Sequence, residues 1–230
     1  PAQGMEACPQ ASGPGLDWRF EAGHVPLVKA VGDTGATALS QPPTGSPDIE
    51  PVRVIIDETE LARTVARMAH QILEANRGAA NLLLLGIPTR GVCLANRLAA
   101  LIEQIEGAPV RVGQLDITMY RDDLRRQPTR LVGRTSIPGS IDDAVVVLVD
   151  DVLFSGRTIA AAFDALRDLG RPRAVRLAVL VDRGHRELPI AADNVGRSIS
   201  TAADERVAVR LSEVDGYDRV TIARVKEGQP

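Results

Sequence analysis

Two adjacent carboxylates and two hydroxyls within nine residues are the part of this 230-residue sequence best suited to chemistry. Asp150 and Asp151 follow the apolar run Val145–Val149, and Ser155 and Thr158 come next in a short glycine-containing loop. Carboxylates accept hydrogen bonds from neighbouring sugar hydroxyls. A loop that opens a helix offers backbone amides, hydroxyls and the positive end of the helix dipole to a phosphate. The pattern therefore favours a sugar-phosphate site.

The flanking residues indicate which elements position this loop. The run before the acidic pair has five consecutive apolar residues, four of them valine, which is typical of a strand buried on both faces of a parallel sheet. After the loop, Ile159, Phe163, Leu166 and Leu169 recur at helical spacing and predict the apolar face of an amphipathic helix. Ligands of open α/β sheets lie at the carboxyl ends of the strands. The alternative is an ordinary strand-to-helix turn with two solvated aspartates.

The same alternation of strand and helix recurs along the chain. Asp57 and Glu60 form an N-cap and N3 pair for a helix that runs through Glu74. The segments that read as strands are 52–56, 81–87, 110–120, 174–181, 206–211 and 219–225. We therefore predict an α/β fold with a mainly parallel sheet flanked by helices.

Two further loops carry donors at predicted strand ends. Thr89 and Arg90 follow the second strand, where a bidentate guanidinium suits a pyrophosphate, and Gly91 permits close backbone approach. The segment 121–139 is long, polar and basic, which is typical of a flexible lid that closes over a reactive substrate. An exposed hairpin that never closes is the alternative.

Composition sets the domain boundary. Residues 1–50 hold seven of the 15 prolines and seven of the 20 glycines without sustained periodicity, so we expect a largely disordered extension and a folded domain over 51–230. No apolar run reaches the length of a membrane span. The two cysteines suggest neither a metal site nor a disulfide framework, so we expect a reduced cytoplasmic location.

Charge limits the surface available to nucleic acid. The net charge is −3, and the first 50 residues hold two basic and six acidic side chains. The rest of the chain is close to neutral. A nucleic-acid surface must therefore be a local patch.

Residues 145–158 resemble the phosphoribosyl-pyrophosphate (PRPP) signature of the type I phosphoribosyltransferases. Over residues 52–225 the sequence is similar to one family in particular, the PyrR proteins, which are pyrimidine operon regulators with uracil phosphoribosyltransferase activity. The stretches that carry this resemblance are 67–70 (RMAH), 86–91 (GIPTRG), 115–124 (LDITMYRDDL), 145–158 and 181–190 (VDRGHRELPI).

The resemblance implies the type I phosphoribosyltransferase fold and the conversion of uracil and PRPP to UMP and pyrophosphate. Mg²⁺ is expected to be held mainly through PRPP or pyrophosphate oxygens and water, with no protein metal site. Asp150, Asp151 and Arg90 are the expected catalytic residues. The expected substrate-binding residues are Thr89, Arg90, Arg121, Asp150, Asp151, Val152, Leu153, Phe154, Ser155, Gly156, Arg157, Thr158, Arg183 and Val207.

The resemblance also implies UMP-dependent binding of operon leader mRNA by a homodimer or higher homo-oligomer. The residues expected to contact RNA are Arg67, His70, His185, Arg186 and Arg197. Two positions depart from the family, which usually has threonine at Ala66 and a basic residue at Ala191. A salvage enzyme without an RNA-regulatory role is therefore an alternative, and the same fold acting on hypoxanthine or guanine is a third interpretation.

Overall fold

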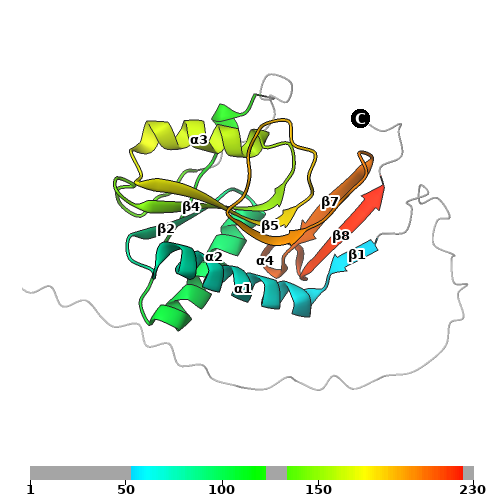
Figure 1. Cartoon of the computed structure of the whole chain (residues 1–230), viewed down its shortest axis with the longest axis horizontal. Coiled ribbons are helices and arrows are strands. Elements are labelled where there is room, and N and C mark those ends of the chain that lie inside the picture. Colours follow the sequence, from blue (N-terminus) through cyan, green and yellow to red (C-terminus); the bar gives the residue numbers. More distant parts are fainter. Residues whose placement is uncertain (1–52, 123–133, 225–230) are drawn as a thin grey trace, which may run out of the picture. The chain divides into compact units, whose positions relative to one another are not determined.

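The computed structural model describes residues 53–122 and 134–224 (Figure 1). The predicted extension over residues 1–50 lies outside the described residues, as does the middle of the predicted lid. The described chain forms helices α1 to α4, one 3₁₀ turn and strands β1 to β8. Their order is β1 Arg53–Ile56, α1 Glu58–Asn76, β2 Leu82–Gly86, α2 Arg90–Glu106, β3 Arg111–Gln114, η1 Thr118–Tyr120, β4 Val145–Leu153, α3 Arg157–Leu169, β5 Ala174–Asp182, β6 Asn194–Ser198, β7 Glu205–Arg210, α4 Ser212–Asp215 and β8 Arg219–Arg224.

The sheet that carries the acidic pair is parallel, as predicted. Its five strands have the order β3-β2-β4-β5-β6 within the described chain. Strand β4 is central and pairs with β2 from Leu82 opposite Val145, and with β5 from Ala174 opposite Val145. The carboxyl ends of these strands meet at one edge, so the loops after them lie together.

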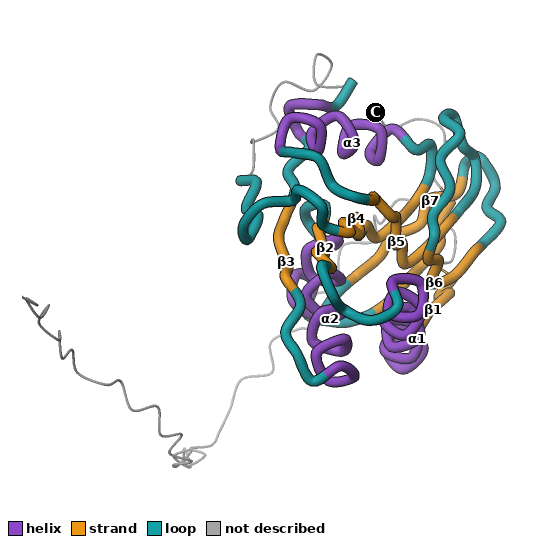
Figure 2. The backbone as a smooth tube through the Cα atoms, turned by 60° about the vertical axis from the view of Figure 1, so that its left-hand side comes forward, coloured by secondary structure: helices purple, strands orange, loops and turns teal. Residues whose placement is uncertain are grey.

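Both faces of this sheet are covered, which explains the continuous apolar runs of its strands. Leu82 and Leu84 of β2 pack in one core with α1 and α2, while Leu83 and Leu85 pack in a second core with α3. Figure 2 shows α1 and α2 on one side of the sheet and α3 on the other. The residue alternation of a strand thus sends successive side chains into two separate cores.

A second, antiparallel sheet is built from distant parts of the described chain. Its order is β1-β8-β7, with Arg53 opposite Ile222 and Val207 also opposite Ile222 (Figure 1). The two late strand-like segments are therefore strands, but they belong to this separate sheet. Strand β6 was not predicted, since Asn194–Ser198 contains a single β-branched residue.

Helix α1 begins where predicted. The Asp57 carboxylate accepts a hydrogen bond from the backbone amide of Glu60 at 2.8 Å, and the helix ends at Arg77, whose φ of 58° is left-handed. An acceptor at this position satisfies one of the amides that have no partner within the helix.

Two predicted elements differ from the structure. The predicted strand 110–120 is a strand only over Arg111–Gln114, because the Asp116 carboxylate accepts hydrogen bonds from the Thr118 amide and hydroxyl and turns the chain. The predicted apolar face of α3 is also partly wrong, since Phe163 and Leu169 are exposed and alanines fill the buried side together with Ile159. None of the described helices has the length and apolarity to cross a membrane.

Candidate active site

A cavity of about 530 Å³ opens at the carboxyl edge of the parallel sheet. It is lined by residues that follow β2 and β3 and by the second half of β4. Its lining residues are Ile87, Pro88, Thr89, Asp116, Ile117, Thr118, Arg121, Asp150, Asp151, Val152 and Thr158. The cavity therefore joins the predicted pyrophosphate loop, the acidic pair and the predicted phosphate loop in one space.

The acidic pair lies inside strand β4. Asp150 is buried and Asp151 is half-buried, and both line the cavity. The backbone amide of Asp151 donates to Asp150 Oδ1 at 2.9 Å, and the amide of Val152 donates to Asp151 Oδ1 at 2.9 Å. These bonds fix one oxygen of each carboxylate and leave the other oxygen for ligand hydroxyls.

The surroundings disfavour the charged form of both acids. Burial and the neighbouring Asp151 charge raise the pKa of Asp150 well above its ordinary value, and the Arg121 charge opposes this. Burial also raises the pKa of Asp151, while the Val152 amide and the Arg90 charge oppose it. A ligand that donates hydroxyl hydrogen bonds therefore enters a site where negative charge is poorly solvated.

The predicted phosphate loop forms a second, smaller cavity. This cavity of about 210 Å³ is lined by residues 152–159 together with Arg121, Asp122 and Asp150. Gly156 precedes α3 with a left-handed φ of 92°, and the first amides of a helix have no acceptor within it. Because the two cavities share Arg121, Asp150, Val152 and Thr158, a sugar in the first can carry a phosphate into the second.

Side chains of this loop differ in what they offer. Leu153 packs in the core with α3, so its contribution to the phosphate cavity is mainly backbone. Arg157 pairs with Glu187 at 2.6 Å and with Asp122. The Arg121 guanidinium lies 3.4 Å from the Thr158 hydroxyl. The loop is thus held by charged groups from two other segments.

The segment after β5 supports the phosphate loop from behind. The amides of Glu187 and Leu188 both donate to the Ser155 carbonyl at 3.0 Å. Arg186 donates to the Phe154 carbonyl at 2.9 Å and to the Ile190 carbonyl at 2.9 Å. This arrangement fixes residues 154–156 against residues 186–190.

Arg183 and Phe154 extend the site towards the antiparallel sheet. Arg183 is buried and donates to the Thr201 hydroxyl at 3.1 Å and to the Ala202 carbonyl at 3.3 Å. Val207 lies in β7, packed against the core that contains α1 and α2, and does not line either cavity described above. The structure thus brings all the predicted substrate residues except Arg90 and Val207 to the cavities or to the loop beside them.

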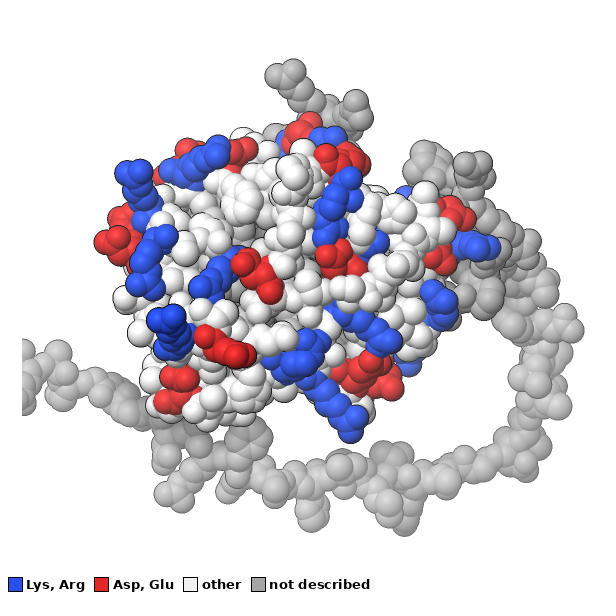
Figure 3. Space-filling model, in the orientation of Figure 1, with Lys and Arg blue, Asp and Glu red and all other residues white. Residues whose placement is uncertain are grey.

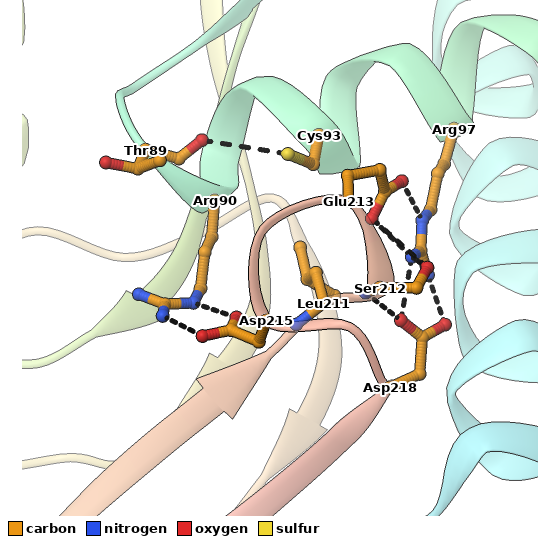
Figure 4. Close-up of polar contacts among 9 residues, drawn as sticks. All are labelled: Thr89, Arg90, Cys93, Arg97, Leu211, Ser212, Glu213, Asp215 and Asp218. Carbon is orange, nitrogen blue, oxygen red and sulfur yellow. Dashed lines mark hydrogen bonds and ion pairs between the residues drawn. The ribbon is translucent and has the colours of Figure 1, made fainter.

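The Arg90 side chain pairs with α4 and is not among the residues lining the cavity, although its neighbour Thr89 is. Its Nε and Nη2 atoms donate to the Asp215 carboxylate at 3.0 and 2.8 Å (Figure 4). Gly91, next in the chain, is packed against β4, because a Cβ there would lie 2.4 Å from the Val149 carbonyl oxygen. The predicted pyrophosphate loop is therefore held by β4 on one side and by α4 on the other.

Asp116 is a site residue that the sequence interpretation did not assign. Its Oδ2 atom is buried in the cavity wall with no hydrogen-bond partner among the described residues. The signal was available, because Asp116 follows β3 at the same sheet edge as the acidic pair. Among the described residues, no three His, Cys, Asp or Glu side chains converge on a metal-sized space. The carboxylates present suit a cation that arrives bound to a polyphosphate and keeps its waters.

The predicted RNA residues fall into two groups. Arg67 on α1 donates to the carbonyls of Val195 and Gly196 in β6, next to Arg197, and His70 is exposed one turn further along α1. His185 and Arg186 lie instead beside the phosphate loop. His185 Nε2 is 2.6 Å from the Thr201 carbonyl, and Arg186 Nη2 pairs with Asp182 at 2.5 Å.

The electrostatic surface is mixed. On the face shown in Figure 3, basic and acidic side chains are interspersed. Arg197, one of the predicted RNA residues, pairs with Glu60 of α1. On this face a nucleic-acid surface would therefore be a small patch, in agreement with the near-neutral charge of the domain.

Comparison with known proteins agrees with this geometry. The model of the phosphoribosyl transferase domain family matches residues 54–211, which include every residue lining the two cavities. Solved structures share the fold at 18% sequence identity. They include the hypoxanthine phosphoribosyltransferase of Trypanosoma cruzi (TM-score 0.58, 76% of this chain and 97% of that chain). Another is a hypoxanthine-guanine phosphoribosyltransferase of Bacillus anthracis (TM-score 0.56, 78% of this chain and 100% of that chain). Fold and site thus define the class, a type I phosphoribosyltransferase.

Curated relatives define the family within that class. "Bifunctional protein PyrR" of Leifsonia xyli is 62% identical over 175 residues, which span 74% of this chain and 96% of the relative. The proteins of the same name from Streptomyces coelicolor and Mycobacterium tuberculosis are 60% and 56% identical, over 74% and 75% of this chain and 89% and 93% of the relatives. This chain belongs to the PyrR family. The predicted family, fold and phosphoribosyltransferase activity are confirmed.

Proposed function

We propose that this chain converts uracil and PRPP to UMP and pyrophosphate at the cavity beside β4 and regulates pyrimidine genes by UMP-dependent binding of operon mRNA. The observation that carries the enzymatic part is the acidic pair of β4: both carboxylates line the larger cavity, and Asp150 also lines the smaller one. Membership of a family whose curated members are called bifunctional supports the second activity.

The roles of the residues follow from charge and position. Asp150 and Asp151 bind the ribose hydroxyls, and their charge stabilises the positive charge that builds on the ribose as its C1–oxygen bond to pyrophosphate breaks. The amides and hydroxyls of residues 155–158 bind the 5′-phosphate. Thr89 and Arg121, which line the larger cavity, bind the leaving pyrophosphate with Arg90.

The base is bound at the side of the site formed by Arg183 and Phe154. A fixed aromatic ring and the backbone of the following loop hold a planar ring in line with C1. Mg²⁺ bound with PRPP would shield the pyrophosphate charge, and Asp116 and the acidic pair, which line the larger cavity, would be the carboxylates available to its waters. We assign no general base among the residues that the structure describes.

Assay with alternative bases tests the enzymatic proposal. Purified protein with PRPP and Mg²⁺ is expected to form UMP from uracil and no nucleotide from hypoxanthine or guanine. A preference for either purine would support the third interpretation and contradict uracil as the substrate.

Titration with leader RNA tests the regulatory proposal. Leader RNA from the organism's own pyrimidine operon is expected to bind more tightly with UMP, and the affinity is expected to fall steeply with salt. Weak binding that is indifferent to UMP and to RNA sequence would favour the salvage enzyme. This outcome needs testing because Ala66 and Ala191 stand where the family usually has threonine and a basic residue. Analytical ultracentrifugation of the same samples tests the proposed homodimer or higher oligomer. A cytoplasmic location is part of this proposal because both substrates and the mRNA are intracellular.

A further inference from the structure

Two arginines of helix α2 hold the loop that joins β7 to β8. Arg90, at the first residue of α2, binds Asp215, and Arg97, seven residues later, binds Glu213 and Asp218 (Figure 4). The two arginines differ in what lies beside them. Arg97 lies about two turns further along α2, whereas Arg90 directly follows Thr89 of the cavity wall.

The Asp215 carboxylate is fixed by more than Arg90. It accepts hydrogen bonds from the Leu211 amide at 2.9 Å and from Arg210 at 2.8 Å, and its side chain is only 9% exposed. These donors and the two from Arg90 lower the pKa of Asp215, so the group is ionised at neutral pH. Asp215 is therefore a rigid, charged acceptor that dictates where Arg90 lies.

The pairing uses one edge of the Arg90 guanidinium. Nε and Nη2 bind Asp215, and no hydrogen bond of the described residues uses Nη1, which lies on the side away from Asp215 in Figure 4. A guanidinium has a second edge that can bind an oxyanion while the first is occupied. The Arg90 charge also acts on the acidic pair, since it opposes the rise in the pKa of Asp151 that burial causes.

We propose that Asp215 is a positioning residue for pyrophosphate: it holds Arg90 by the Nε–Nη2 edge and orients the remaining edge for the leaving group. This inference rests on the proposed role of Arg90. It makes pyrophosphate binding depend on the loop between β7 and β8, which belongs to the other sheet. Asp215 does not touch the substrate and acts through Arg90 alone.

Asp218 offers a matched control for Asp215. It lies in the same loop, its side chain is 13% exposed, and it binds an arginine of the same helix through both carboxylate oxygens at 2.6 and 2.8 Å. Each of Asp215→Asn and Asp218→Asn therefore removes one carboxylate charge that binds an α2 arginine through both oxygens, and Arg97 keeps Glu213 in the second variant. Any effect of loosening the loop as a whole appears in both variants.

The test measures pyrophosphate inhibition and the KM for uracil in the full chain. Asp215→Asn is expected to weaken pyrophosphate inhibition and raise the KM for PRPP about tenfold with little change in the KM for uracil. Asp218→Asn is expected to leave pyrophosphate inhibition as in the wild type. In an Arg90→Gln background, Asp215→Asn is expected to have no further effect, because both act through one group.

Three outcomes separate the inference from the function it rests on. Weaker pyrophosphate binding in Arg90→Gln but not in Asp215→Asn overturns the role of Asp215 and leaves that of Arg90. Unchanged binding in Arg90→Gln removes the pyrophosphate role of Arg90 itself, and the inference with it. Equal losses in Asp215→Asn and Asp218→Asn show a general effect of the loop and also overturn it. Should Asp215→Asn not fold, Asp215→Glu keeps the charge but moves the carboxylate, and wild-type pyrophosphate inhibition in it would contradict the inference.

Discussion

The guanidinium of Arg183 lies over the ring of Phe154, with its central carbon 4.3 Å from the ring centroid. His185 meets the same ring edge-on at 6.2 Å between centroids. The contact joins the segment after β5 to the phosphate loop. The buried Arg183 guanidinium therefore lies between the proposed base-binding and phosphate-binding sides of the site. Burial lowers the pKa of Arg183.

Removing this cation is expected to affect both stability and turnover. Arg183→Gln loses the ring contact and the hydrogen bonds to Thr201 and Ala202, at a cost of about 2–3 kcal/mol of unfolding free energy. The KM for uracil is expected to rise, as measured by steady-state kinetics. Arg167→Gln is the control, since the Arg167 side chain is 79% exposed and its ion pair with Asp164 lies within the same helix. A wild-type KM for uracil in Arg183→Gln would contradict its place at the base.

The acidic pair is expected to favour function at the expense of stability. The double substitution Asp150→Asn and Asp151→Asn is expected to lower kcat/KM for PRPP by at least about a hundredfold. The melting temperature at neutral pH is expected to rise, because the variant no longer buries two poorly solvated charges. Full activity in the folded double variant would remove the ribose-binding assignment.

Replacing Asp142, an aspartate outside the site, is expected to change the melting temperature in the opposite direction. The pKa of Asp142 is lowered, first by the hydrogen bond from the Arg171 amide. Asp142→Asn is therefore expected to lower the melting temperature at neutral pH. Circular dichroism melting curves of Asp142→Asn and of the acidic-pair double variant measure the two changes in melting temperature.

The raised pKa values also predict how stability and binding depend on pH. At a pH between the unfolded and folded pKa of Asp150, the folded state binds more protons than the unfolded state, so the contribution of this group to stability falls as pH rises through that window. Substrate hydroxyls donate to the ionised form. The KM for PRPP is therefore expected to fall with rising pH, over a range above the ordinary pKa of aspartate. A KM for PRPP that is constant over that range would contradict raised pKa values of Asp150 and Asp151 in the protein without substrate.

Gly91 is expected to tolerate no side chain. A Cβ at this position meets the Val149 carbonyl, which is backbone and cannot rotate away. Gly91→Ala is expected to destabilise the protein by about 1–3 kcal/mol and to weaken pyrophosphate inhibition by displacing the loop. Gly107 ends α2 with a φ of 73° and has open space around it, so Gly107→Asn is the control, with a small effect expected in both measurements.

His70 gives the cleanest test of the proposed RNA surface. It is exposed on α1, and its ring plays no part in the described core. His70→Ala is expected to weaken leader RNA binding in the presence of UMP by about 1–3 kcal/mol in a filter-binding or fluorescence titration. Arg167→Gln on α3, across the parallel sheet, is expected to bind as the wild type. Equal affinity of His70→Ala and wild type would exclude this part of α1 from the interface.

Local sequence signals predicted the parts of the fold that depend on neighbouring residues. The valine run of β4 and the Asp57 cap each determine their own conformation, so the start of β4 and the start of α1 were predicted correctly. Strand β4 was predicted to end at the acidic pair, but it continues through the pair to Leu153. The family resemblance then placed the site. Strand 110–120 was predicted too long because its end is set by the Asp116 side chain.

Contacts between distant residues could not be predicted in this way. The pairing of Arg90 with Asp215 joins residues 125 positions apart, and nothing near either residue indicates the other. The same holds for Arg186, whose internal partners include the Phe154 carbonyl 32 positions away. From the sequence, a basic loop residue such as Arg186 suggests a contact with nucleic acid. In the structure, Arg186 also holds the phosphate loop through its hydrogen bond to the Phe154 carbonyl.

The antiparallel sheet has a consequence for synthesis on the ribosome. Strand β1 is made first among the described strands, yet its hydrogen-bonding partner is β8, which is made last. The nascent chain can therefore complete β2 to β5, with the acidic pair, before β1 has anywhere to pair. The loop that carries Asp215 is enclosed by β7 and β8 only when Arg219–Arg224 has emerged. Each newly made molecule thus acquires the parallel-sheet strands that carry the acidic pair before the antiparallel sheet can form.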